Sequence, residues 1–75
     1  MGTLNERAGR VMKEIRESRK MSKSELARLM EVDGATIFRL ENNVQKFDLV
    51  KIEAFCRAAK VNQLTFFRKV AQVKP

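Results

Sequence analysis

The side chains that could do chemistry in this sequence are mainly basic. Sixteen Lys and Arg residues stand against nine Asp and Glu, which gives a formal net charge of +7 and an isoelectric point near 10.2. A surplus of this size favours a polyanionic partner, either a nucleic acid or an anionic membrane surface. The alternative is a basic surface that is simply solvated and has no such partner.

Groups that could catalyse a reaction are scarce. The chain contains no His, and its single cysteine, Cys56, falls on an apolar helix face. There is no glycine-rich phosphate loop and no cluster of carboxylates. Because general acid–base and nucleophilic chemistry need such groups, the sequence predicts a protein that is not an enzyme. It also predicts no metal, no cofactor and no small-molecule substrate.

The sequence also limits where the protein is expected to act. One cysteine cannot form an intrachain disulfide, and no apolar segment approaches the length of a transmembrane helix. The N-terminus lacks the layout of a signal peptide. We therefore expect a cytoplasmic protein, and we expect no membrane among its partners.

Helices must position the basic side chains, because alternating strand-like patterns are absent. The length fits a single domain, residues 1–75, and apolar runs of helical period predict an all-α fold of five helices. The apolar rows of the first, fourth and fifth helices include Leu4, Leu49 and Leu64. The expected N-caps are Thr3, Ser22, Asp33, Asp48 and Asn62, with Glu6 and Glu25 at capping-box spacing behind the first two.

The most informative stretch lies at about residues 22–42. Two short helices with a tight turn between them can cross steeply only if a small residue sits at the crossing, and Ala27 is that residue. Val32 is placed to fill the turn, and Ile37 and Leu40 to contact it from the second helix. This pattern predicts a helix-turn-helix formed by helices two and three. The alternative is an ordinary helical hairpin whose apolar spacing matches by chance.

From Met12 to Phe67 the sequence resembles the phage-repressor, or Xre-like, helix-turn-helix family. The resemblance implies a five-helix lambda-repressor-like domain, a homodimer, and binding to a roughly palindromic operator in double-stranded DNA. The positions that carry it are Ile15, Arg16, Ser22, Glu25, Leu26, Ala27, Val32, Thr36, Ile37, Arg39, Leu40, Glu41, Asn42, Ala58 and Val61.

Several positions depart from the family pattern, and all of them concern the shape of loops rather than the fold. Asn43 tolerates a left-handed backbone, whereas Glu31 would cost about 1 kcal/mol there. Family glycines are replaced by Lys20, Glu31, Asn43 and Lys60, the usual Gln by Lys23, and the proline before helix four by Phe47.

The third helix has a predicted reading face opposite its buried side, since a helix turns about 100° per residue. That face carries Gly34, Ala35, Phe38 and Arg39. Arg39 could pair with guanine or reach a phosphate, while Phe38 and Ala35 suit thymine methyl groups. Gly34 would let the backbone approach the bases. The alternative for Phe38 is partial burial against a neighbouring helix.

Phosphate contacts are expected around this face. The free N–H groups at the start of the second helix favour an anion. The side chains expected to contact phosphates are Lys23, Thr36, Asn42, Asn43 and Lys46. The alternative for each lysine is a solvated surface charge.

Two further roles are expected. By family resemblance, Arg16 and Glu41 form a buried ion pair that links helix one to the third helix; the alternative is an exposed pair of little energetic weight. Phe66, Phe67 and Val70 add more apolar surface than one small core needs. Helices four and five, at about 48–73, are therefore the expected dimer interface, unless all of this surface packs within one monomer.

The sequence as a whole predicts a sequence-specific transcriptional regulator that binds double-stranded DNA as a homodimer. A repressor is favoured, because repression needs only occupancy of the operator. Alternatives are an antitoxin or restriction–modification controller that regulates its own promoter, or a protein-binding adaptor with the same fold.

Overall fold

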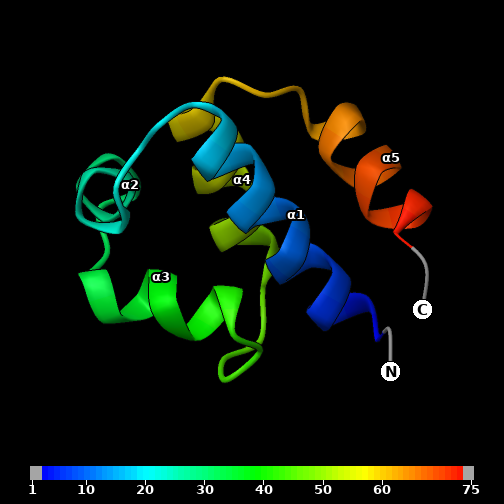
Figure 1. The fold of residues 1–75 in the computed structure, drawn as a ribbon, viewed down its shortest axis with the longest axis horizontal. Helices are drawn as coiled ribbons and strands as arrows, with labels where there is room; N and C mark the ends of the chain where they lie inside the picture. Colours follow the sequence, from blue (N-terminus) through cyan, green and yellow to red (C-terminus); the bar gives the residue numbers. More distant parts are fainter. Residues whose placement is uncertain (1–2, 74–75) are drawn as a thin grey trace.

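The computed structural model describes residues 3–73, which form five helices (Figure 1). The helices are α1 (Leu4–Ser18), α2 (Lys23–Met30), α3 (Gly34–Glu41), α4 (Leu49–Ala59) and α5 (Gln63–Gln72). This part of the chain contains no β-strand, so the predicted all-α class is confirmed. The predicted domain also takes in residues 1–2 and 74–75, which lie outside the described residues. Within 3–73, no helix has the length and apolar character needed to cross a membrane.

Each helix begins directly after its predicted N-cap, because a short polar side chain there accepts a hydrogen bond from a free backbone N–H. Thr3 and Glu6 form a complete capping box, with both bonds between 3.0 and 3.2 Å. At the second predicted box the Ser22 side chain accepts from the Glu25 N–H at 3.0 Å. Asp33, Asp48 and Asn62 cap the other three helices in the same way.

The turns keep the left-handed backbone of the family glycines although the glycines are gone. Lys20, Glu31, Asn43 and Lys60 have φ between 56° and 60°. Glu31 and Lys60 are the C-caps of α2 and α4, where left-handed geometry lets the chain leave the helix. The loop shapes therefore follow the family despite the substitutions, at an expected cost of about 1 kcal/mol for a side chain such as Glu31.

A single core lies between the five helices. The rings of Phe55 and Phe66 meet edge to face at 5.7 Å between centroids. Phe66 and Val70, which were expected at a dimer interface, are buried inside the monomer. This corrects the expectation for these two residues, because α5 turns their side chains towards α1 and α4. The largest fully buried side chains are Phe55, Phe66, Met12, Leu26, Ile37, Leu40, Val11 and Val70.

The crossing of α1 and α3 depends on a glycine that the sequence patterns did not single out. A Cβ atom at Gly9 would lie 2.5 Å from the backbone oxygen of Leu40 and 3.3 Å from that of Glu41. Only glycine allows the two backbones to approach so closely. In Figure 1, α3 lies at the lower left of the molecule, and its C-terminal end, with Leu40 and Glu41, approaches the side of α1.

Candidate nucleic-acid interface

The pair α2–α3 has the predicted helix-turn-helix packing. Ala27 is buried at the crossing, and Ile37 and Leu40 have no exposed surface. Val32 packs partly buried against the core, and its N–H donates to the oxygen of Ala27 at 3.0 Å across the turn. The four predicted clamp residues therefore hold α3 by its inner face, which leaves the opposite face free.

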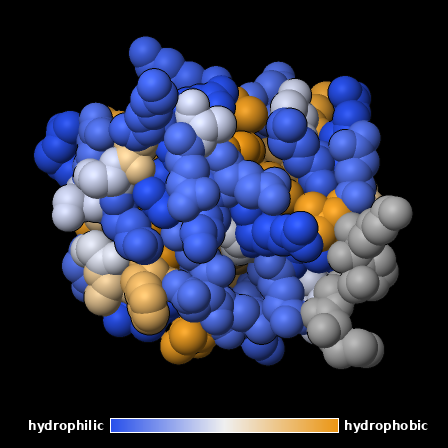
Figure 2. All heavy atoms as spheres, viewed as in Figure 1, coloured by the Kyte–Doolittle hydropathy of each residue, from blue (hydrophilic) through white to orange (hydrophobic). Residues whose placement is uncertain are grey.

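The free face of α3 is the predicted reading face. Gly34, Ala35 and Phe38 are exposed, and Phe38 keeps 53% of its surface in solvent. Burial of Phe38 by a neighbouring helix is thereby excluded in the monomer. Figure 2 shows apolar side chains gathered at the lower-left edge, over α3 and the connection that follows it, on a face that is otherwise largely hydrophilic. Val44, in that connection, is also exposed.

Arg39 is half-buried and is held on three sides by polar partners. Its Nε donates to Gln45 Oε1 at 3.1 Å, and its Nη2 lies 3.4 Å from Thr36 Oγ1. The Asp33 carboxylate is 3.8 Å from the same nitrogen. Hydrogen bonds from Thr36, aided by the charge of Arg39, hold the pKa of Asp33 below its usual value. The guanidinium is therefore presented at the surface in a fixed orientation.

Thr36 differs from its expected role. Its side chain is buried, and its hydroxyl donates to the Asp33 carboxylate at 2.8 Å. The expectation that this hydroxyl reaches a phosphate is corrected, because the N-cap of α3 has already engaged it.

The other expected phosphate ligands lie at the surface. Lys23, the first residue of α2, is exposed, as is Lys46 in the connection after α3. Asn42 is exposed at the end of α3, where its Nδ2 donates to the oxygen of Phe38 at 2.8 Å. Asn43 is exposed too, although its Oδ1 accepts a hydrogen bond from Asn5.

The predicted pair Arg16–Glu41 is present and buried. Two hydrogen bonds of 2.7 and 3.2 Å join the Arg16 guanidinium to the Glu41 carboxylate. The Arg16 side chain is 8% exposed and the Glu41 side chain is 1% exposed. Arg16 also donates to the oxygen of Met21 at 2.8 Å. The hydrogen bond to Glu41 raises the pKa of Arg16 further above its already high value. The pair links the C-terminal end of α3 to α1 and so fixes the position of α3 relative to the core.

Comparison with known families decides what this arrangement is. The family model described as Helix-turn-helix matches residues 12–62, which is more than half of the chain. The chain belongs to this family. As an Xre-like helix-turn-helix protein, it is a DNA-binding transcriptional regulator with the five-helix fold that the sequence predicted.

Solved helix-turn-helix structures superpose closely on this one. The wild-type restriction-modification controller protein C.Esp1396I gives a TM-score of 0.87 at 23% identity, over 92% of this chain and 90% of that chain. The clp gene regulator ClgR from C. glutamicum gives 0.88 at 19% identity, again over 92% and 90%. These likenesses show the shared fold. Comparison with curated protein sequences gives no significant match.

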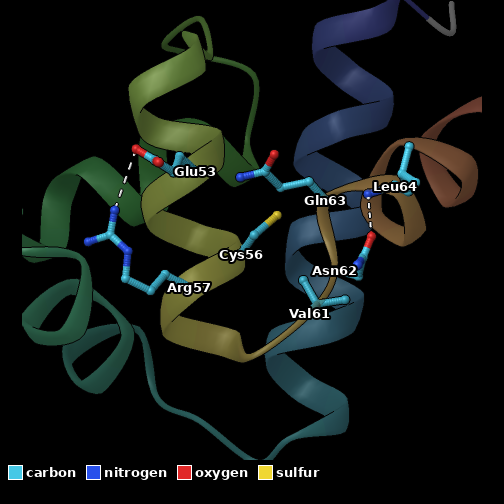
Figure 3. Close-up of a pocket in the computed structure, with 7 residues that line it drawn as sticks. All are labelled: Glu53, Cys56, Arg57, Val61, Asn62, Gln63 and Leu64. Carbon is cyan, nitrogen blue, oxygen red and sulfur yellow. Dashed lines mark hydrogen bonds and ion pairs between the residues drawn. The ribbon is translucent and has the colours of Figure 1, made fainter.

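A separate hollow of this helix-turn-helix protein lies between α4 and α5 (Figure 3). Its one acidic side chain, Glu53, pairs with Arg57 at 3.4 Å. The Cys56 thiol points into the space between the helices, and burial raises its pKa, which disfavours the reactive thiolate. Among residues 3–73 no three His, Cys, Asp or Glu side chains are grouped to hold a metal ion.

The outer faces of α4 and α5 expose an apolar surface, which includes Leu49 and Leu64 from the predicted apolar helix rows. We call Leu49, Val50, Leu64 and Phe67 the α4–α5 patch. Leu49 is 78% exposed and Leu64 is 71% exposed, and Phe67 is also exposed. Leu49, Val50 and Phe67 together line a hollow of about 340 Å³. Of the three residues predicted at a dimer interface, Phe67 alone lies in this patch.

Proposed function

We propose that this helix-turn-helix protein is a repressor that binds a palindromic operator as a homodimer. The observation that carries the proposal is the geometry of α3, which is clamped on one side by buried apolar residues and open on the other. An α-helix held in this way has the width and exposure needed to enter the major groove of B-DNA.

The chemistry of the open face suggests how bases are read. Ala35 and Phe38 offer apolar contacts for thymine methyl groups, and Gly34 has no Cβ to keep the backbone from the bases. Arg39 offers paired donors suited to the O6 and N7 atoms of guanine. So apolar a face makes few hydrogen bonds to bases, and DNA shape is therefore expected to contribute to specificity.

Phosphate contacts orient the reading helix in this proposal. Lys23 and the N-terminus of α2 precede α3 in the sequence, and Asn42, Asn43 and Lys46 follow it. Contacts at both ends would fix the register of α3 along the groove. A dimer that neutralises roughly six to ten phosphates is expected to lose affinity steeply as salt concentration rises.

The α4–α5 patch is the proposed dimer surface. Large apolar side chains that stay exposed in a monomer indicate a partner, and a symmetric dimer buries the same patch twice. Two copies of α3 could then meet half-sites one turn of DNA apart, about 34–36 Å. Binding rather than catalysis is the proposed activity, and the cytoplasm is its proposed location, where the DNA of a cell without a nucleus lies.

Repression follows from occupancy, since no segment among residues 3–73 is available as a separate sensor. A controller or antitoxin that regulates its own promoter would share the same operator-binding step. An adaptor would not, because its ligand is a protein.

Selection of bound duplexes from a random pool tests the proposal. We expect one enriched sequence with two inverted half-sites, and bound fractions that fall with salt. Phe38→Ala and Arg39→Ala are expected to lower discrimination between this sequence and random DNA about tenfold or more. Arg68→Ala, on the far helix α5, is the matched control and should leave discrimination unchanged. A pool that shows no enrichment contradicts operator binding.

A further inference from the structure

We propose that Asn5 is a positioning residue that sets DNA specificity by fixing the connection that holds Arg39. This inference rests on the proposed function, because it assigns a role to the neighbours of a residue proposed to read bases. Asn5 belongs to the first turn of α1, far in sequence from α3, and it is not one of the residues of the predicted reading face.

Asn5 is joined to the connection between α3 and α4 at three points. Its Nδ2 donates to Asn43 Oδ1 at 2.7 Å and to the oxygen of Gln45 at 3.2 Å. Its Oδ1 accepts from the N–H of Phe47 at 2.8 Å. One side chain therefore bonds to three residues of a segment that makes no helix and has a left-handed residue, Asn43, at its start.

The orientation of this amide is determined by its backbone partners. The Phe47 N–H can only donate, and the Gln45 carbonyl can only accept. Asn5 must therefore turn its oxygen to the first and its nitrogen to the second. An isosteric Asp keeps the bond from Phe47 but loses the donor to Gln45, so the two halves of the contact can be separated by substitution.

The same connection holds Arg39 from its other side. The N–H groups of Val44 and Gln45 both donate to the backbone oxygen of Arg39, at 2.8 and 3.2 Å. The side chain of Gln45 accepts from Arg39 Nε at 3.1 Å. Gln45 is therefore the shared member, since its backbone is fixed by Asn5 and its side chain fixes the guanidinium.

The consequence concerns specificity more than affinity. A guanidinium held by Gln45 is pre-oriented, so it loses little freedom on pairing with one base. Without Asn5 the connection has fewer fixed points, and Arg39 can turn towards phosphates or other bases. Affinity for unrelated DNA depends on charge. It is expected to stay the same in Asn5→Ala, which changes no charge, and to fall in Asn5→Asp, which adds a negative one.

The test compares full-length variants on two duplexes, one carrying the sequence selected by the wild type and one changed at the base pair that Arg39→Ala no longer discriminates. Asn5→Ala and Asn5→Asp are each expected to reduce discrimination between the duplexes about threefold to tenfold. Adding either Asn5 change to Arg39→Ala should cause no loss beyond that of Arg39→Ala alone, because a residue that acts through Arg39 is not additive with it. Gln45→Ala should behave like them, which keeps the test valid if an Asn5 variant folds poorly.

Thr3→Ala is the matched control. Thr3 is the N-cap of α1, two residues before Asn5, and its side chain bonds to the Glu6 N–H. The substitution therefore changes the same end of α1 but removes no hydrogen bond to the connection between α3 and α4. It is expected to lower the unfolding midpoint while leaving discrimination unchanged. If Asn5→Ala keeps full discrimination, or if its loss adds to that of Arg39→Ala, Asn5 has no positioning role and operator binding still stands. If the wild type selects no sequence at all, the proposed function itself fails.

Discussion

At the scale of single residues, the buried charges of Arg16 and Glu41 have the largest expected energetic weight. A carboxylate with 1% of its side chain exposed has no water to replace a lost partner. Arg16→Met is therefore expected to lower the free energy of unfolding by about 3–5 kcal/mol. That is a large part of the total for a domain of this size. Urea denaturation followed by circular dichroism measures it.

Two comparisons make this prediction specific. Adding Glu41→Leu to Arg16→Met is expected to restore stability in part, because an apolar pair of similar volume leaves no buried charge. The exposed pair Arg10–Glu14, 3.5 Å apart on α1, is the control, and Arg10→Met should cost less than about 1 kcal/mol. Equal costs for the two Arg→Met changes would show that the buried pair is not special.

Asp33 provides a prediction of pH dependence. Its pKa is lowered from the ordinary 3.8, first by hydrogen bonds from Thr36 and then by the charge of Arg39. A lowered pKa in the folded state means that the ionised form stabilises the fold. This stabilisation is complete above the ordinary pKa and is lost as the pH falls through the lowered one.

Asp33→Asn isolates that effect, since Asn is also a good N-cap but does not titrate. The difference in unfolding free energy between wild type and variant should be constant from about pH 7 to about pH 5 and shrink towards about pH 2. Glu6, whose pKa is also lowered, is present in both proteins and so drops out of the difference. A difference that does not change with pH would mean that the Asp33 charge has no part in stability.

At the scale of elements, the crossing of α1 and α3 rests on Gly9. A methyl group there would overlap the backbone oxygen of Leu40, which a rotamer change cannot move. We expect Gly9→Ala to lower the free energy of unfolding by about 1–3 kcal/mol, despite the better helix propensity of Ala. Thermal and urea unfolding measure the change.

Gly34→Ala is the matched control for this substitution. A Cβ at Gly34 meets nothing within 4 Å, and the residue lies in the first turn of α3. This variant is expected to be about 0.4–1 kcal/mol more stable than the wild type, because Ala restricts the unfolded chain. Should both glycines tolerate Ala equally, the close approach of α1 and α3 would not be a constraint on the fold.

The elements also show why some features could be predicted and others could not. N-cap chemistry is local, so Ser22, Asp33 and Asp48 indicated the helix starts to within one residue. Hydrophobic periodicity reports that a face is apolar but not what covers it. Leu49 and Leu64 therefore looked like core residues and are exposed.

Part of the candidate site was likewise beyond the reach of sequence patterns. The outward face of α3 followed from helical geometry alone. The hydrogen bond from Thr36 to Asp33, and that from Arg39 to Gln45, depend on side-chain directions that a sequence pattern does not give. The contacts of Asn5 join segments about forty residues apart in the chain. Gly9 gave no signal because its role appears only when a second helix crosses it.

At the scale of the whole molecule, the two exposed apolar regions have separate proposed tasks. Phe38 lies on α3, and the α4–α5 patch lies on other helices, so one copy could contact DNA and a second copy at once. Joining two half-site contacts in one particle makes the second contact intramolecular, which raises affinity about 10²–10⁴-fold over one copy. Dimerisation and operator binding should therefore weaken together.

Leu64→Lys tests this coupling, because it places a charge on a side chain of the α4–α5 patch that is exposed in the monomer. The free energy of unfolding of the monomer should change by no more than about 0.5 kcal/mol. In sedimentation equilibrium the wild type should approach twice the chain mass of 8.7 kDa, and the variant should remain at 8.7 kDa. Operator affinity should fall about 100-fold or more, while affinity for a single half-site stays within about twofold.

Leu29→Lys is the control, because Leu29 is an exposed apolar residue on α2, outside the patch. It is expected to leave the sedimentation mass unchanged. A Leu64→Lys protein that stays dimeric would remove the α4–α5 patch as the interface. A wild type that sediments as a monomer and binds the full operator no more tightly than a single half-site would remove the dimer altogether.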